Sequence, residues 1–335
     1  MKRMKYAALL AATCTALPAG AQIVFSEDFD DGLASTRWSA PFFDSEDGVA
    51  DGTVDYAFDY VALGLPLAPG GGSGTGVFFE ANVIDNTGDE GVSLAIIPLA
   101  PSLPSGSFRM TMDAYLNIET ANGGTTEYGT FGVHAFPAND PLDPGLTDDA
   151  PLRFGLSNGS GVAWQIDGDA GSSIDILRYE DANNGDMGAQ TSLGAFDDLP
   201  SGVIPGLPAN ATGSNAIGPG NNWVQIAIER IGNNLSFSIN GYVIDSIFDG
   251  SGAFDGGGIM LGYSDAFNSV ASPDYLVGPD PTPFDNTDGP FGDAFPGLAH
   301  FLVIDNVVVE AVVPEPTTLA LVLPVMAGLA MRRRA

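Results

Sequence analysis

Carboxylate side chains are the residues of this sequence with the clearest capacity for chemistry. The densest group, Glu27, Asp28, Asp30 and Asp31, lies near the start of the chain. Hard oxygen ligands on glycine-rich loops are what Ca²⁺ binds in proteins. Smaller acidic groups, interspersed with Asn and Gly, are Asp167 with Asp169, Asp181 with Asp186, and Asp285 with Asp288. None completes the consecutive calcium loop of an EF-hand, so a calcium site must combine separate parts of the chain.

Asp305 is an acid in an apolar run near the end of the sequence. Phe301, Val303, Val307 and Val309 alternate there as in a strand and predict one apolar side, on which Asp305 also falls. An unpaired charge among inward-facing apolar side chains costs free energy. The sequence therefore predicts that Asp305 has a partner.

The predicted partner is a cation. If the first and last strands of the domain lie together, a Ca²⁺ ion can bridge Asp28 or Asp30 with Asp305 and tie the chain ends together without a disulfide. The alternative is that Asp305 lies at a strand edge, hydrated or bonded to backbone amides. In that case the 42 acidic residues act as a solvated coat that keeps the protein soluble.

The charge distribution excludes several classes of chemistry. The 335 residues contain 11 basic and 42 acidic side chains, a net charge of −31, and between the two ends there is no lysine. Cys14, the one cysteine, lies in the N-terminal apolar segment, so thiolate, iron–sulfur and thiolate-zinc chemistry are excluded from the interior. Nucleic acid is not an expected partner, because the negative field repels phosphates. The interior basic residues are Arg37, Arg109, Arg153, Arg178 and Arg230.

Known catalytic motifs are weakly represented. Residues 155–159 match G-x-S-x-G, but the residues that follow read as a strand rather than the helix that a nucleophile elbow needs. His134 and His300 are the available bases, and both are interpreted as structural histidines in or beside strands. Trp38, Trp164 and Trp223 could stack on sugar rings, although aromatic residues on alternating strands belong more often to a core.

The N-terminal segment has the features of a signal peptide. Residues 1–21 combine a basic start, an apolar stretch and a small-residue cleavage signal that ends at Ala21. A lipoprotein signal ending at Cys14 is the weaker alternative. We therefore expect export through the Sec pathway and a mature chain that begins at Gln22.

The C-terminal segment, residues 313–335, contains three ordered features. Pro314, Glu315 and Pro316 precede an apolar segment of residues 317–331, predicted to be a helix, which is followed by Arg332, Arg333 and Arg334. This order resembles the PEP-CTERM sorting signal. The resemblance implies transient anchoring in the membrane through the helix and removal of the tail by an exosortase. It also implies delivery to the cell surface or extracellular matrix of a Gram-negative bacterium that makes exopolysaccharide. The alternative is a permanent membrane anchor.

Residues 22–312 are predicted to form one all-β domain. Short alternating apolar runs are separated by many of the 44 glycines and 24 prolines. The clearest unit is a meander from Trp223 to Ile247, in which Asn240 and Gly241 form a two-residue hairpin turn. Residues 183–222 and 264–299 read as long irregular stretches, and the glycine-rich run 70–76 as a flexible bend.

Three segments resemble the concanavalin A-like and laminin-G-like jelly roll. They are residues 27–38, the meander, and residues 304–307. Residues 58–66 and 163–169 also resemble a group of secreted PEP-CTERM proteins, which implies the same cellular location and fold. Retaining glucanases of this fold carry E-x-D-x-x-E along one strand, a pattern absent from this sequence; Asp113 lacks the flanking acids. We therefore expect a jelly-roll β-sandwich with long loops that acts without catalysis, binding glycan, Ca²⁺ or other matrix components. The alternative function is a secreted polysaccharide-active hydrolase.

Overall fold

The computed structural model describes ten stretches of the chain, from Gln22 to Val312: residues 22–45, 52–81, 92–117, 127–135, 161–168, 175–180, 191–205, 218–252, 254–265 and 300–312. The predicted signal peptide and sorting segment lie outside the described residues. So do the G-x-S-x-G match, Arg153, and the acids Asp169, Asp181, Asp186, Asp285 and Asp288.

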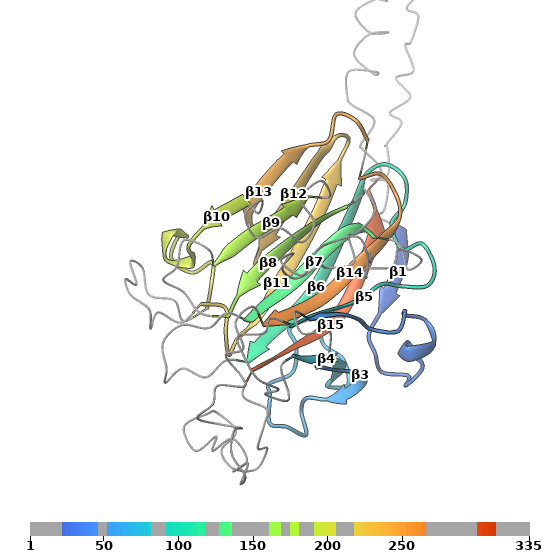
Figure 1. Cartoon of the computed structure of the whole chain (residues 1–335), viewed down its shortest axis with the longest axis vertical. Coiled ribbons are helices and arrows are strands. Elements are labelled where there is room, and N and C mark those ends of the chain that lie inside the picture. Colours follow the sequence, from blue (N-terminus) through green and yellow to red (C-terminus); the bar gives the residue numbers. More distant parts are fainter. Residues whose placement is uncertain are drawn as a thin grey trace, which may run out of the picture.

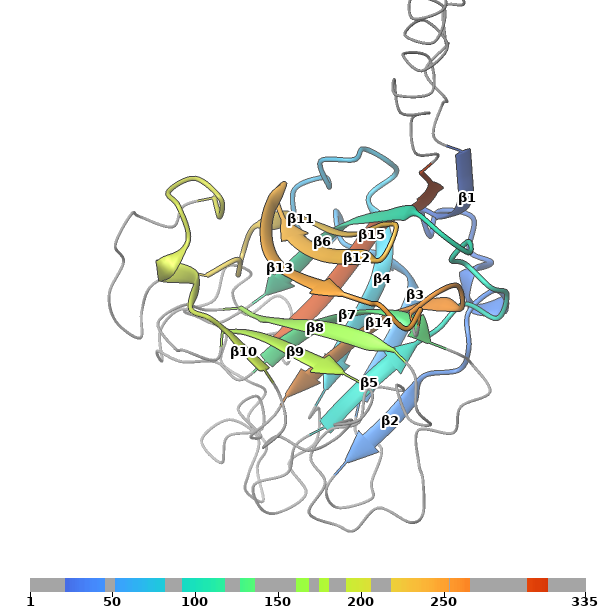
Figure 2. The same ribbon diagram turned by 90° about the horizontal axis from the view of Figure 1, so that it is seen from above.

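Two antiparallel sheets pack face to face (Figures 1 and 2). The first has the order β13-β12-β11-β6-β15-β4-β3, with β1 also paired to β15. Its strands are β1 (Gln22–Glu27), β3 (Gly52–Asp59), β4 (Thr75–Ala81), β6 (Phe108–Asn117), β11 (Trp223–Ile231), β12 (Asn234–Ile239), β13 (Tyr242–Phe248) and β15 (Phe301–Ala311).

The second sheet has the order β10-β9-β8-β7-β14-β5-β2. Its strands are β2 (Phe42–Ser45), β5 (Val92–Ile96), β7 (Glu127–Ala135), β8 (Val162–Asp167), β9 (Ile176–Glu180), β10 (Thr191–Gly194) and β14 (Gly258–Asp265). Short 3₁₀ helices cover Ala34–Thr36 and Phe196–Asp198. The all-β sandwich prediction is confirmed. Within the described ranges, no helix is long and apolar enough to cross a membrane.

The core between the sheets follows from strand alternation. In the meander, every second side chain of β11 and β12 faces the second sheet and is buried, as the alternation predicts. Asn240 and Gly241 both have positive φ, at 50° and 79°, as the predicted hairpin turn requires. Trp164 of β8 stacks on Phe237 of β12 across the interface, with ring centroids 5.3 Å apart. The stretch predicted to be irregular from residue 183 contains β10 and a 3₁₀ helix, so that prediction is wrong there.

A bulge divides β15 into two halves that face opposite ways. The pairing with β6 shifts register between Asp305 and Val308, and Asn306 adopts a left-handed φ of 54°. Val307 therefore points into the core between the sheets, whereas Val303 points to the outer face of the first sheet. The prediction that the apolar residues of this strand share one side is wrong, because the extra residue reverses the alternation. Asp305 lies on the outer face.

A second, smaller core covers that outer face. The segment of residues 60–74, between β3 and β4, packs on strands β4, β6, β11 and β15. The buried members of this outer core are Tyr60, Leu63, Leu65, Ala68, Phe78, Tyr115, Trp223, Phe301 and Val303. Trp223 donates from Nε1 to the carbonyl of Pro66 at 2.7 Å. Like Trp38 and Trp164, Trp223 is buried, so all three tryptophans are packing residues rather than exposed sugar platforms.

Candidate functional site

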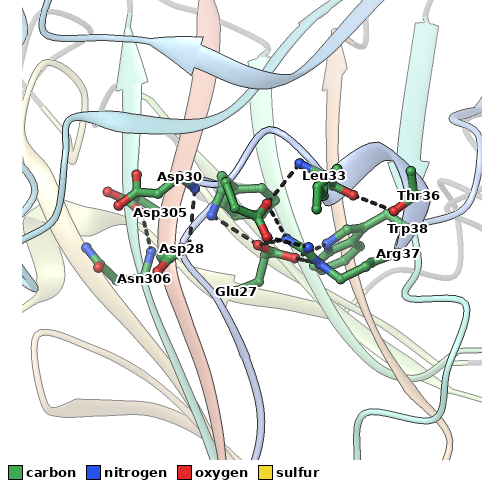
Figure 3. Close-up of polar contacts among 11 residues, drawn as sticks. Glu27, Asp28, Asp30, Leu33, Thr36, Arg37, Trp38, Asp305 and Asn306 are labelled. Atoms are coloured by element: carbon green, nitrogen blue, oxygen red, sulfur yellow. Dashed lines mark hydrogen bonds and ion pairs between the residues drawn. The ribbon is translucent and has the colours of Figure 1, made fainter.

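Pairing of the first and last strands brings the acidic turn after β1 to the bulge of β15. Glu27 lies opposite Val307, so the residues that follow Glu27 run beside Asn306 and Asp305. Phe29 holds this turn in place, because its fully buried ring stacks on Trp38 with centroids 5.9 Å apart. Figure 3 shows Asp28 and Asp30 on this turn and Asp305 and Asn306 on β15. The first and last strands therefore lie side by side, as the calcium hypothesis requires.

Two buried carboxylates face each other at the floor of the site. Asp305 of β15 and Asp113 of β6 are directly opposite in the antiparallel ladder, and only 1% and 3% of their surfaces are exposed. Asp305 accepts hydrogen bonds from the Tyr60 hydroxyl at 2.8 Å and from the backbone N–H of Asn306 at 2.6 Å. Asp113 Oδ2 accepts from the Gly70 N–H at 2.8 Å and from Asn306 Nδ2 at 3.0 Å.

Burial makes the charged form of both acids costly. It raises the pKa of Asp305 to about 7, an effect that the hydroxyl of Tyr60 and the amide of Asn306 oppose and that the negative charges of Asp30 and Asp113 reinforce. Burial also raises the pKa of Asp113, although its contacts with Gly70 and Asn306 oppose the shift. Like charges directly opposite in a sheet repel. Ionisation of both facing carboxylates is therefore unfavourable, and protonation of one of them is favoured.

Exposed acids form the rim of the site. Asp30 is exposed, and its carboxylate bonds the Ser73 hydroxyl while its charge acts on Asp305. Asp28, also exposed, accepts the N–H of Asp30 at 3.2 Å. Of the three predicted calcium ligands, Asp30 and Asp305 are thus brought together and Asp28 lies on the same turn. In the described part of the chain, no three His, Cys, Asp or Glu side chains are grouped closely enough to hold a metal ion.

Gly70 lets the covering segment approach the floor closely. A Cβ added there would lie 2.7 Å from Asn306 Cγ and 2.7 Å from Asp113 Oδ2. No side chain fits at that separation, so glycine is needed for the backbone N–H to reach Asp113. The predicted bend is present in this glycine-rich run, and Gly70, Gly72 and Ser73 lie against the acids of the site.

Arg37 neutralises the other two acids of the N-terminal group, Glu27 and Asp31. Its guanidinium donates to Glu27 at 2.7 and 2.8 Å and to Asp31 at 2.8 and 3.0 Å. Trp38 Nε1 also donates to Glu27, at 3.3 Å. Glu27 and Asp31 are therefore part of a structural ion-pair network and are not available as metal ligands. Figure 3 shows Arg37 and Trp38 beside Glu27. Sequence reasoning missed this pairing, although the basic residue lies within ten positions of both acids.

Arginines elsewhere in the sandwich are also engaged with acids. Arg178 pairs with Asp245 at 2.9 Å, which joins the two sheets, and with Glu180 at 2.9 Å. Arg230 pairs with Asp249 at 3.0 Å, with both side chains buried. These guanidinium groups stabilise the sandwich and do not form a basic surface for an anionic ligand.

The two histidines lie in structural positions. His134 Nδ1 is 3.2 Å from the carbonyl oxygen of Gly256, and His300 Nδ1 is 2.7 Å from the buried carboxylate of Glu127. The pair of Glu127 and His300 was not anticipated, because the residues are far apart in the sequence and neither belongs to a recognisable motif. Both histidine contacts agree with the structural role assigned from the sequence.

No protein-family model matches the sequence, and no curated protein is significantly similar to it. Among solved structures, the chain is similar to a Bacillus subtilis protein of unknown function with a galectin-like fold, at a TM-score of 0.42 and 10% identity over 87% of this chain and 96% of that chain. It is also similar to the catalytic domain of an endo-1,3-β-glucanase (laminarinase) from Thermotoga petrophila, at a TM-score of 0.38 and 12% identity over 87% of this chain and 98% of that chain. A third similar structure is the carbohydrate-binding module CBM66 from Bacillus subtilis, at a TM-score of 0.33 and 10% identity over 80% of this chain and 95% of that chain. All three are similarities of chain fold.

Proposed function

We propose that the chain is an exported, non-catalytic protein of the cell surface or extracellular matrix, built on a concanavalin A-like jelly roll and associated with exopolysaccharide or other matrix glycans. The PEP-CTERM-like segment, residues 313–335, supports delivery by an exosortase. In this proposal the membrane holds the precursor through residues 317–331 until processing near Pro314, Glu315 and Pro316.

The proposal of a non-catalytic role rests on the covered position of the two facing carboxylates, those of Asp113 and Asp305. A glycoside hydrolase needs two carboxyl groups on opposite sides of a sugar ring, about 5–10 Å apart and open to the substrate. Asp113 and Asp305 converge, but residues 60–74 cover them, and their oxygens are bonded to Tyr60, Gly70 and Asn306. The alternative of a polysaccharide hydrolase therefore has less support than a binding role.

Calcium is the proposed cofactor of the acidic site. Asp30, Ser73 and Asp305 supply oxygen donors from the turn after β1, the covering segment and β15. Asp28, on the same turn as Asp30, is the further ligand in the proposal. A bound divalent cation would neutralise the buried carboxylate of Asp305 and hold three separate segments together. These oxygen atoms are of the kind that Ca²⁺ binds, and in this proposal the ion stabilises the fold.

The charges of the sandwich restrict the class of glycan. Arg37, Arg178 and Arg230 are occupied by internal acids, and the net charge of the chain is −31. An acidic polysaccharide would therefore be repelled unless divalent cations screened or bridged the two partners. We propose that the ligand is a neutral glycan, or an acidic one that binds only in the presence of Ca²⁺.

Mass spectrometry of the exported protein tests the proposed sorting. We expect an N-terminus at Gln22 and a C-terminus close to Pro314, because the signal peptide and the sorting segment are both removed. Peptides that contain Arg332 to Arg334 should be confined to the precursor in the membrane fraction. Their recovery in the mature surface protein would instead indicate a permanent anchor.

A further inference from the structure

An exposed aromatic ring lies on the edge strand of the first sheet. Phe248, the last residue of β13, is 74% exposed, the largest exposed fraction of any large apolar side chain in the described ranges. The ring lies against Gly250, where an added Cβ would be 2.9 Å from the ring carbon Cε1. A single exposed apolar side chain is common on protein surfaces, so the neighbours of Phe248 decide what the ring can do.

Two neighbouring strands extend the exposed surface around Phe248. Asn234 of β12 lies opposite Phe248, and Ile231 of β11 lies opposite Asn234. The next residue of β12, Leu235, is buried in the core, so strand alternation places these three side chains on the outer face of the sheet. Ile231 is 44% exposed, and Asn234 is exposed as well. Phe248, Asn234 and Ile231 form the Phe248 patch, in which an aromatic and an aliphatic side chain flank an exposed amide.

Buried contacts behind the Phe248 patch fix the strand ends that carry it. Arg230 and Asp249 each lie next to a residue of the patch, and the ion pair between them, at 3.0 Å, joins β11 to the end of β13. The N–H of Asp249 also donates to the carbonyl of Asn233, in the turn between β11 and β12, at 2.7 Å. A surface that is ordered before it binds a ligand loses less conformational entropy on binding.

The Phe248 patch is uncharged on a strongly acidic protein. Between Ile231 and Phe248 the sequence has one charged residue, Asp245. Its side chain is 9% exposed and pairs with Arg178 at 2.9 Å, and Asp249 is paired internally as well. A second copy of this chain, with its own net charge of −31, would be repelled from the patch, whereas a neutral ligand would not.

We propose that the Phe248 patch binds a neutral glycan, an inference that rests on the proposed function and locates its ligand site. The apolar C–H face of a pyranose ring packs on the Phe248 ring, and sugar hydroxyl groups exchange hydrogen bonds with the Asn234 amide. Ile231 adds apolar contact on the other side of the amide. Few polar groups among apolar ones are typical of small-ligand sites, where the apolar contacts give affinity and the polar groups fix orientation.

The Phe248 patch is separate from the acidic site. Gln225 of β11 lies opposite Asp113, six positions before Ile231 in the same strand. At about 3.4 Å per residue, the patch is roughly 20 Å from the acidic floor. Binding of a neutral glycan at the patch therefore uses none of the proposed calcium ligands.

Affinity electrophoresis of the exported protein in gels that contain a polysaccharide tests this site. The neutral probes are a soluble β-glucan, a mannan and a galactan, and the acidic probe is alginate with Ca²⁺. Phe248→Ala removes the ring, Phe248→Leu keeps an apolar side chain without a ring, and Phe248→Tyr keeps the ring. Leu99→Ala, at a residue after β5 that is 57% exposed, controls for the loss of an exposed apolar side chain. Sedimentation velocity of wild type and Phe248→Ala measures self-association.

We expect at least one neutral polysaccharide to retard wild type, and Phe248→Ala and Phe248→Leu to bind it about tenfold more weakly or worse. Phe248→Tyr and Leu99→Ala should bind within about threefold of wild type, because neither removes the aromatic surface. We expect wild type to sediment as a monomer.

Three results would overturn the site and leave the proposed function intact. They are wild-type affinity in both Phe248→Ala and Phe248→Leu, binding of alginate alone, and self-association that Phe248→Ala abolishes, which would assign the patch to a second copy. Binding of none of the four polysaccharides by wild type would overturn the site and the proposed glycan association together.

Discussion

Asp305→Asn is expected to stabilise the calcium-free protein at pH 8 by up to about 4 kcal/mol relative to wild type. The buried carboxyl has a pKa of about 7 in the folded protein, against about 3.9 in an unfolded chain. The folded state therefore binds a proton more tightly, and the contribution of this group to stability is lost as the pH rises from about 4 through 7. Asparagine keeps the shape and removes the charge; its Oδ1 can still accept from the Asn306 N–H, and its Nδ2 replaces an acceptor of the Tyr60 hydroxyl with a donor.

Urea unfolding in the presence of chelator at pH 5 and pH 8 measures this effect. The difference between the variant and wild type should grow with pH. Asp198→Asn, which removes one exposed acid, controls for the general loss of negative charge. A variant that is less stable than wild type at both pH values would show that the Asp305 carboxylate is held by favourable contacts rather than penalised by burial.

Arg230→Ala is expected to reduce the free energy of unfolding by about 3–5 kcal/mol, because it leaves Asp249 charged and buried without its partner. The two side chains are only 4% and 1% exposed, and their closest atoms are 3.0 Å apart. Asp249 also accepts from the Phe254 N–H at 3.0 Å and the Ser251 hydroxyl at 3.0 Å, contacts that cannot neutralise its charge. Chemical denaturation at pH 7 gives the loss directly.

Two further variants separate charge from packing at this position. Arg109→Ala removes an exposed arginine from the same sheet and should change stability by less than about 0.5 kcal/mol. Arg230→Met combined with Asp249→Asn removes both charges while keeping the acceptor for Phe254, and it should recover most of the loss. If the double variant is as unstable as Arg230→Ala, lost packing rather than the unpaired charge is the cause.

Local sequence signals predict the parts of the fold that depend on neighbouring residues. The β11 to β13 meander follows from two alternating runs and from Asn240 and Gly241, whose tolerance of positive φ fixes the turn. The proximity of β1 and β15 follows from the expected arrangement of a jelly roll. These features need only residues close in sequence or a general rule of the fold.

The acidic floor could not be predicted in the same way. Its geometry depends on the register of β15 against β6, which places Asp305 opposite Asp113 across 192 positions of sequence. Residues 301–304 and 307–309 are apolar at every position, so the pattern does not tell which of them face the core and does not reveal the bulge at Asn306. The close approach of Gly70 depends in turn on that floor. Contacts set by long-range register leave no local periodicity for sequence reasoning to detect.

Thermal unfolding of the exported protein with millimolar Ca²⁺ and with chelator tests the central claim most directly, which is that a cation bridges the turn after β1 and the bulge of β15. Ca²⁺ at a hundredfold excess over its Kd adds about 2.7 kcal/mol to the free energy of unfolding. Wild type should therefore melt several degrees higher with Ca²⁺. Asp305→Asn and Asp30→Asn should show a much smaller shift, and Asp198→Asn the full one. Equal melting temperatures of wild type with Ca²⁺ and with chelator would contradict the bridge and leave the site as a proton-holding acid pair.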